Sequence, residues 1–340
     1  MTLLKFLRAY SLNVMKPIRA ALTLFLATRN PWTVLLVILR IKKEVVIEIK
    51  SKPETFAIKA NIKNHKVLYY LCLLRNRYGL IFRNGKLEFP PHTIRISRGQ
   101  KITKGELIII YSAYRYGLLL DEYDEKHFLA QLRDGHKFMI RKNIGIDIEA
   151  INETFIRGVY REFCNNLKGK TVLDIGAFIG DTPIMFSHNG AKEVYAYEPD
   201  TEAYNLASRN IELNNINNVK LFNIGISNRS GKLFIKVFGG RKRSLIDVVP
   251  LSEVIEHVGK VDILKMDCEG CEFPALLSLN LKTLRKIGEM IIEYHKDPLP
   301  IVKKLRKGGF YVKIESPWTY VDGKPVGFLY ARRESFNAPT

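Results

Sequence analysis

Acidic, amide and imidazole side chains follow several apolar runs in the second half of this sequence. These runs lead into Asp174, Glu198, Asn223, Asp267 and His295. Carboxylates in such positions can accept hydrogen bonds from hydroxyl groups, hold a cationic group or take up a proton. A histidine beside them titrates near neutral pH. The pattern therefore predicts one site that binds a polar ligand and moves a proton.

The first run leads into a loop that contains two glycines. The loop consists of Asp174, Ile175, Gly176, Ala177, Phe178, Ile179, Gly180 and Asp181. Glycine is needed where a backbone turns tightly or lies against a ligand. A pyrophosphate favours a central glycine, where this chain has Phe178, and would be repelled by Asp181, which we predict at the helix N-cap. The loop therefore favours the methionine end of S-adenosylmethionine, with its ammonium and sulfonium, over a dinucleotide. A purely structural capped turn is the alternative.

Two further segments supply candidate contacts for a nucleoside. Glu198 and Pro199 end the second run, 24 residues after Asp174. A carboxylate there can accept hydrogen bonds from both ribose hydroxyls. Asn223 and Gly225 lie in the third run, where main-chain amides and neighbouring isoleucines can hold an adenine ring. Solvated turn residues and ordinary core positions are the structural alternatives.

The fourth and fifth runs contribute the candidate catalytic residues. Asp267, Glu269 and Glu272 follow the fourth run, and His295 ends the fifth. These side chains could remove a proton from an attacking hydroxyl, bind a cationic substrate group or hold a divalent cation. Helix N-terminal acids and a hydrogen-bonded structural histidine are the alternatives. No ligand spacing in the sequence supports a metal, so a metal site is not predicted.

Strands and helices alternate through residues 151–340, which we predict as one domain. The expected parallel strands are residues 171–175, 193–198, 219–226, 261–267 and 289–295. Helices are expected from about residue 182 and over residues 201–214. Residues 310–316 and 327–333 flank a turn and predict an antiparallel pair of strands. The fold class is therefore α/β, with a Rossmann-like sheet whose ligands bind beyond the carboxyl ends of the strands.

The first 150 residues follow a different pattern. Residues 1–44 predict a basic helical arm, which either packs on the rest of the protein or lies on an anionic membrane or RNA. Residues 45–150 alternate with a period of two and predict a small, mostly antiparallel β region. Its expected strands are residues 45–50, 55–60, 78–82, 92–97, 106–112 and 136–141.

Basic residues are concentrated at the front of the chain. The net charge is +20, and residues 1–104 hold 21 basic and 4 acidic side chains, which leaves 33 and 30 for the rest. An apolar content of 46% excludes a disordered chain. The charge therefore predicts that the front region docks on an anionic surface, with a membrane ahead of nucleic acid.

The cysteines and the apolar segments predict where the protein resides. Four scattered cysteines do not form a disulfide framework, and a reducing interior is expected. Cys268 and Cys271 form a C-x-x-C without the further ligands of a metal tetrad, so we assign the pair no role. Arg29 and Pro31 interrupt the apolar stretch at residues 20–39. We expect a cytoplasmic protein that is soluble or peripheral to a membrane.

Taken together, these motifs resemble the FkbM family of S-adenosylmethionine-dependent methyltransferases, which have the class I fold. The resemblance covers about residues 150–333 and is carried by residues 172–181, 194–200, 205–219, 261–272 and 291–295. It implies that Gly176, Gly180 and Asp181 hold the methionine end, that Glu198 binds the ribose, and that Asp267 and Glu269 lie beside the transferred methyl group. The antiparallel C-terminal pair also matches the class I sheet. Phe178 departs from the asparagine common in such loops.

The resemblance implies O-methylation of a hydroxyl on a sugar, a glycan or a related metabolite. An RNA methyltransferase that docks phosphates on its basic front is the alternative, although Asp267 and Glu269 stand where nitrogen methyltransferases often place an N-P-P-Y-like segment. A non-catalytic binding module is disfavoured by the intact loop and Glu198. An NAD-dependent oxidoreductase is disfavoured by Phe178.

Overall fold

A computed structural model describes residues 44–49, 56–61, 81–83, 86–89, 92–95, 104–161, 167–237 and 242–333. The chain divides into two compact units, residues 1–149 and 150–340. The predicted helical arm, residues 1–44, lies almost entirely outside the described residues. Among the described residues, no helix is long and apolar enough to cross a membrane.

Among its described residues, the first unit shows three small antiparallel sheets and one long helix. The strands are β1 (Glu44–Ile49), β2 (Phe56–Asn61), β3 (Ile81–Arg83), β4 (Lys86–Phe89), β5 (His92–Arg95), β6 (Leu119–Glu122), β7 (His127–Gln131) and β8 (Lys137–Arg141). They pair as β1-β2, β3-β4-β5 and β6-β7-β8. The prediction of a mostly antiparallel β region is therefore correct for five of its six expected strands.

The sixth expected strand, residues 106–112, is wrong because it lies in a helix, α4 (Lys104–Tyr116). A short apolar run does not distinguish a strand from a buried helix. Ile109, Ile110 and Ala113 are all buried, which is the spacing of one helix face. Gly117, with φ of 73°, follows the helix end, and its N–H donates to the Tyr114 carbonyl.

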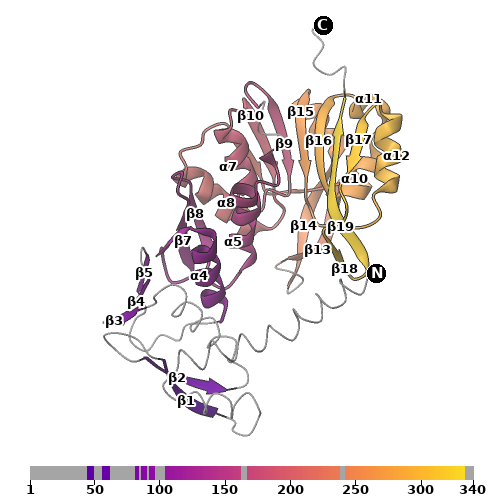
Figure 1. Ribbon diagram of the computed structural model, residues 1–340. Coiled ribbons are helices and arrows are strands. Elements are labelled where there is room, and N and C mark those ends of the chain that lie inside the picture. The colour runs from indigo at the N-terminus through magenta and orange to yellow at the C-terminus, as the bar shows by residue number, and fades with distance from the viewer. Residues whose placement is uncertain are drawn as a thin grey trace. The chain divides into compact units, whose positions relative to one another are not determined.

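The second unit is built on a large, mostly parallel sheet (Figure 1). Its strand order is β11-β10-β9-β15-β16-β19-β17. The strands are β9 (Thr171–Ile175), β10 (Glu193–Tyr197), β11 (Val219–Phe222), β15 (Val261–Met266), β16 (Ile287–Tyr294), β17 (Tyr311–Ile314) and β19 (Lys324–Arg332). β19 is antiparallel to both neighbours, and the short β18 (Thr319–Val321) pairs with it. This order confirms the predicted Rossmann-like sheet with an antiparallel C-terminal pair.

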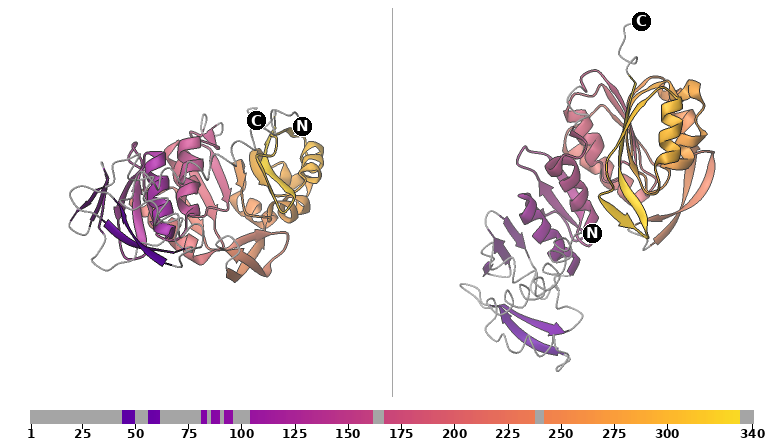
Figure 2. Two further views of the ribbon diagram at one scale, coloured as in Figure 1. Left: turned by 60° about the horizontal axis from the view of Figure 1, so that its bottom comes forward. Right: turned by 45° about the vertical axis from the view of Figure 1, so that its right-hand side comes forward.

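Helices cover both faces of this sheet (Figures 1 and 2). The helical segments of the second unit are the π-helical η1 (Asn152–Arg157), α7 (Asp181–His188), α8 (Thr201–Leu213), α9 (Leu251–Val258), α10 (Glu272–Ser278), α11 (Leu281–Leu284) and α12 (Leu299–Lys307). α5 (Ile146–Ile151) begins in the first unit and leads into η1. Successive residues of β9 point to opposite faces. Val172 packs with Phe186 of α7, whereas Leu173 joins the cluster that contains Leu276 of α10 and Leu305 of α12.

A small second sheet was missed by the sequence prediction. It consists of β12 (Gly225–Ser227), β14 (Lys242–Pro250) and β13 (Gly231–Val237), in the order β12-β14-β13. The predicted single strand over residues 219–226 is therefore two strands, of which β11 belongs to the large sheet and β12 to the small one. The chain changes sheets at Asn223 and Ile224, which lie in neither strand.

Candidate active site

The loop after β9 is held tightly against the end of β15. Gly176 has φ of 84°, and a Cβ atom placed on it would lie 1.8 Å from the Asp267 carbonyl oxygen. Only glycine fits this close approach of two backbones. The N–H groups of Gly176 and Ala177 both donate to the Tyr197 carbonyl oxygen, at 2.9 and 3.0 Å. The loop therefore joins the carboxyl ends of β9, β10 and β15.

Glu198 lies directly beside this loop. Its Oε2 accepts a hydrogen bond from the Phe178 N–H at 2.8 Å, and its Oε1 accepts one from the Asp200 N–H at the same distance. The side chain is buried, and burial raises its pKa to about 7. Each carboxylate oxygen keeps further acceptor capacity. The backbone N–H of Phe178, the central residue of the loop, therefore helps to fix the Glu198 carboxylate.

Asn223, Gly225 and Pro199 lie where β10 and β11 end. The Asn223 side-chain amide donates to the Glu198 carbonyl at 2.9 Å, and its oxygen accepts from the Thr201 hydroxyl at 3.0 Å. A Cβ atom on Gly225 would lie 2.7 Å from Ile246 and 3.4 Å from Pro199. These residues therefore hold the strand ends together beside Glu198.

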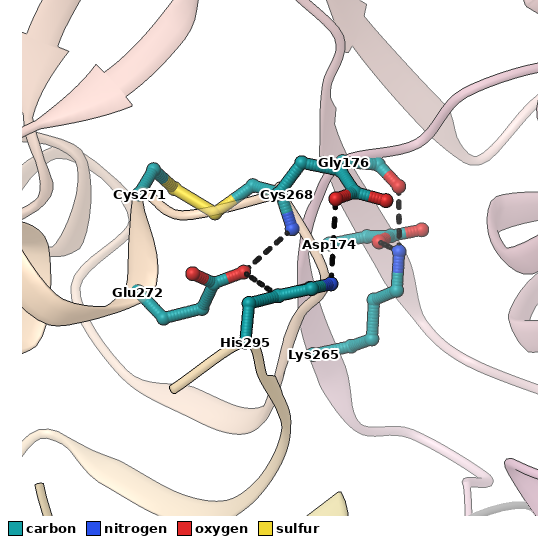
Figure 3. Close-up of a disulfide and its surroundings, with 8 residues drawn as sticks. Asp174, Gly176, Lys265, Cys268, Cys271, Glu272 and His295 are labelled. Carbon is teal, nitrogen blue, oxygen red and sulfur yellow. Dashed lines mark hydrogen bonds and ion pairs between the residues drawn. A yellow bond between two sulfur atoms is a disulfide. The ribbon is translucent and has the colours of Figure 1, made fainter. Parts of the chain in front are cut away.

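Two buried acids lie behind the loop. The Asp174 carboxylate accepts from the Thr182 hydroxyl at 2.6 Å and lies 3.0 Å from Lys265 Nζ, which also donates to the Gly176 carbonyl at 2.6 Å (Figure 3). Asp181 accepts from the Thr154 hydroxyl of η1 at 2.5 Å. Burial raises the pKa of Asp181 to about 6.

The predicted place of Asp181 in the helix is wrong by one residue. Gly180, with φ of 85°, is the N-cap of α7, and Asp181 is its first helical residue. A Cβ atom on Gly180 would lie 3.2 Å from the α8 backbone at Ala207. Glycine at the cap therefore permits a left-handed turn and close packing against α8.

Asp267, Glu269 and His295 come together at the ends of β15 and β16, as the sequence predicted for one site. His295 Nε2 lies 3.4 Å from Glu269 Oε2, and Nδ1 lies 3.4 Å from Glu272 Oε1. Glu293 Oε2 lies 3.9 Å from His295 Nε2. The Tyr160 hydroxyl donates to Asp267 at 3.2 Å. The cluster thus contains four carboxylates around one imidazole.

The close packing of these groups shifts their pKa values. Burial lowers the pKa of His295, but Glu272, Glu269 and Asp267 outweigh it and raise the pKa to about 9. Burial and the neighbouring Asp267 raise the pKa of Glu293 well above its usual range. Burial also opposes ionisation of Asp267, but Lys265 and a hydrogen bond from Glu293 hold its pKa below the usual value.

Cys268 and Cys271 form a disulfide across the turn between β15 and α10 (Figure 3). The sequence-based interpretation that this pair has no role is therefore wrong. Residues three apart can be bridged when the turn brings their Cα atoms near, here to 5.5 Å. Between the two cysteines, Glu269 has φ of 55° and Gly270 has φ of 119°. The disulfide thus closes the loop that carries Glu269 and follows Asp267.

Sequence reasoning missed several residues of this site: Thr154, Tyr160, Thr182, Lys265 and Glu293. Lys265 carried a signal, because a lysine inside the apolar run of residues 261–266 must find a buried partner. Glu293 lies in β16, two residues before His295, which directly follows the strand. Tyr160 and Thr154 precede the predicted strands and gave no such signal.

Comparison with known families identifies this part of the chain. Residues 174–312 match the methyltransferase FkbM domain. The chain carries an FkbM methyltransferase domain. This match confirms the family resemblance drawn from the sequence motifs. It also confirms, for this domain, the methyltransferase class and its cofactor S-adenosylmethionine.

A short segment of the chain is also similar to a methyltransferase with another name. A segment of 51 residues, 15% of the chain, is 47% identical to the ribosomal protein L11 methyltransferase of Thermoanaerobacter sp. (strain X514). The chain spans 17% of that protein's length.

Two solved structures are similar to part of this chain. M. jannaschii TYW2 in complex with AdoMet has a TM-score of 0.40 at 17% identity, over 64% of this chain and 93% of that chain. Magnesium protoporphyrin IX methyltransferase from Synechocystis PCC 6803 has a TM-score of 0.36 at 16% identity, over 56% and 84%. The fold assignment rests on the strand order above rather than on these scores.

Proposed function

We propose that this protein transfers a methyl group from S-adenosylmethionine to a hydroxyl oxygen. The observation that carries the proposal is the buried Glu198 carboxylate, held at the tip of β10 by the N–H groups of Phe178 and Asp200. A fixed carboxylate at the end of the second strand of an open α/β sheet can accept hydrogen bonds from two neighbouring ribose hydroxyls. The match of residues 174–312 to the FkbM domain supports the same cofactor.

The residues around the loop have the chemistry that this cofactor requires. S-adenosylmethionine, when bound, supplies a methyl group that is already activated on a sulfonium. The Asp174 and Asp181 carboxylates lie behind the loop, where they favour a cationic ligand. Backbone groups of Gly176, Ala177 and Gly180 would face its methionine end. Pro199, Asn223 and Gly225 would line the part of the site that holds the adenine ring, beside Glu198.

The acidic cluster at the ends of β15 and β16 would handle the acceptor. Asp267, Glu269 and His295 lie together there and would orient the hydroxyl, and the Asp267 or Glu269 carboxylate would accept its proton. Alignment is the main contribution that such a site makes, because the methyl group needs no further activation. We therefore assign these three residues to the acceptor side and the loop to the cofactor side.

A sugar, a glycan or a related metabolite is the proposed acceptor class. Carboxylates accept hydrogen bonds from the several hydroxyl groups of a sugar, and Glu269 has an exposed side chain at this site. RNA is the second candidate, because residues 1–104 carry an excess of 17 positive charges that would bind phosphates. The same charge would dock the protein on an anionic membrane that presents a lipid-linked acceptor.

Transfer of a tritiated methyl group into fractionated cell extracts tests this proposal. We expect label in the glycan or the lipid-linked pool when the wild-type protein is added, and none with Glu198→Ala. Label in RNA alone, with binding that weakens steeply as salt is added, would replace the acceptor class with RNA. Absence of label from all pools, together with no binding of S-adenosylhomocysteine, would contradict methyl transfer itself.

A further inference from the structure

Two carboxylates and an imidazole converge at the carboxyl ends of β15 and β16. One ligand atom from each of Asp267, Glu293 and His295 lies within 4.8 Å of the other two. The side chains of Glu293 and His295 are 11% and 19% exposed, so the cluster is neither sealed nor fully solvated. Carboxylate oxygens with an imidazole nitrogen form a donor set that divalent ions bind.

The surroundings of the His295 ring are a second, independent observation. Its Nδ1 lies 3.4 Å from Oε1 of Glu272, a side chain that is fully buried. The same Oε1 accepts the Cys268 N–H at 3.0 Å, while Oε2 has no hydrogen-bond partner (Figure 3). A buried carboxylate beside one ring nitrogen fixes the ring and directs the other nitrogen to a ligand, as it does for metal-bound histidines. Here Nε2 faces two carboxylates, Glu269 at 3.4 Å and Glu293 at 3.9 Å.

The charges around the cluster also favour a cation. Asp267 and Glu293 are close neighbours, each with a carboxylate oxygen within 4.8 Å of the other. Lys265 is engaged by the Asp174 carboxylate and the Gly176 carbonyl, and His295 is engaged by Glu272. Two adjacent carboxylates are stable only when a proton or a cation lies between them. The His295 imidazole adds a nitrogen ligand beside the Asp267 and Glu293 carboxylates, which a pair of acids alone would lack.

We propose that Asp267, Glu293 and His295 bind a divalent cation of the Mn²⁺ class, with Glu272 as a positioning residue. The inference rests on the proposed function for its chemical role. An acceptor hydroxyl bound to the cation would lose its proton more readily. That proton would pass to the exposed Glu269 carboxylate, which lies 3.4 Å from His295 Nε2. The new carbon–oxygen bond forms as the carbon–sulfur bond breaks, giving a methyl ether, S-adenosylhomocysteine and one proton.

Titration of the full-length protein with Mn²⁺, followed by the loss of the free-ion EPR signal, tests the site without any cofactor or substrate. We expect the wild type to bind one ion. Glu272→Gln should weaken binding 10- to 100-fold, the usual effect of removing an outer carboxylate from a metal-bound histidine. Glu293→Gln and His295→Gln, which remove ligands, should each weaken it more. Glu212→Gln, an exposed acid on α8, is the matched control and should bind as the wild type does.

Calorimetry with S-adenosylhomocysteine on the same preparations separates this inference from the proposed function. Retained binding of this ligand by the variants would show that they are folded. A wild type that binds S-adenosylhomocysteine but no Mn²⁺ would overturn the cation site alone. Equal Mn²⁺ affinity of the wild type, Glu293→Gln and His295→Gln would also overturn it. Mn²⁺ binding without S-adenosylhomocysteine binding would instead contradict the methyltransferase proposal and leave the cation site supported.

Discussion

Among single residues, Glu198 is the one whose ionisation should control cofactor binding. Its pKa is raised to about 7 by burial, and Asp200 and Lys265 are the charged neighbours that act on it. Only the ionised form offers both oxygens as acceptors to ribose hydroxyls. We therefore expect the affinity for S-adenosylhomocysteine to rise by up to about tenfold between pH 6 and pH 8 as Glu198 loses its proton. Calorimetric titrations between pH 6 and pH 8 measure this affinity.

The control for this pH dependence is Glu198→Gln, which keeps the shape of the side chain but does not titrate. Its weaker binding should change much less between pH 6 and pH 8. An equal pH dependence in both proteins would mean that another group, such as Asp181 with a pKa of about 6, governs binding.

A second residue-scale prediction concerns Gly176, where two backbones approach too closely for any side chain. Gly176→Ala places a Cβ atom 1.8 Å from the Asp267 carbonyl oxygen and adds strain at φ of 84°. We expect it to lower the free energy of unfolding by about 3 kcal/mol or more, measured by urea denaturation.

The matched control is Gly309→Ala, because Gly309 has nearly the same φ, 85°, with no atom within 4 Å of its Cβ position. It should cost about 1–2 kcal/mol from strain alone. Similar losses in the two variants would show that the contact between the loop and β15 is not tight in solution.

On the scale of secondary-structure elements, the disulfide between Cys268 and Cys271 ties the end of β15 to the start of α10. Reduction should lower the free energy of unfolding by at most about 2 kcal/mol, because the closed loop is very short. A thermal scan with and without a thiol reductant measures the change. The double variant Cys268→Ser/Cys271→Ser retains Cys72 and Cys164 and should show no further change on reduction. A reductant effect of the same size in this variant would assign it to other cysteines.

The sequence predicted most strands of the large sheet because most of these strands are apolar runs next to glycine or acidic residues. It failed where pattern alone is ambiguous. Residues 106–112 have the composition of a strand, but packing of Ile109 and Ala113 on one side favours the helix α4. The β13–β14 hairpin is polar and partly exposed, and its strands gave no clear alternation. Contacts such as Tyr160 with Asp267, 107 residues apart, depend on the tertiary fold.

On the scale of the whole molecule, the positive charge belongs to one end of the chain. Residues 1–104 hold an excess of 17 positive charges, whereas the remainder has an excess of only 3. We expect the full-length protein to sediment with vesicles that contain phosphatidylserine, and this binding should decline as salt screens the charges. Vesicles of phosphatidylcholine alone are the control. Equal binding to both kinds of vesicle, or salt-independent binding, would contradict electrostatic docking.

The sequence located this charge but could not identify its partner, since an anionic surface attracts basic residues whatever its chemistry. The candidate site was easier to predict, because the strand order of an open α/β sheet brings the ends of β9, β10, β15 and β16 to one edge. The sequence did not reveal how the acidic side chains around His295 share protons, because this depends on distances of a few ångströms.

Calorimetric titration of the full-length protein with S-adenosylhomocysteine tests the central claim most directly. We predict saturable binding to the wild type with one site per chain. Glu198→Ala should bind at least about tenfold more weakly, because two hydrogen bonds to the ribose are lost. Failure of the wild type to bind, or equal binding by Glu198→Ala, would contradict the assignment of this site to S-adenosylmethionine.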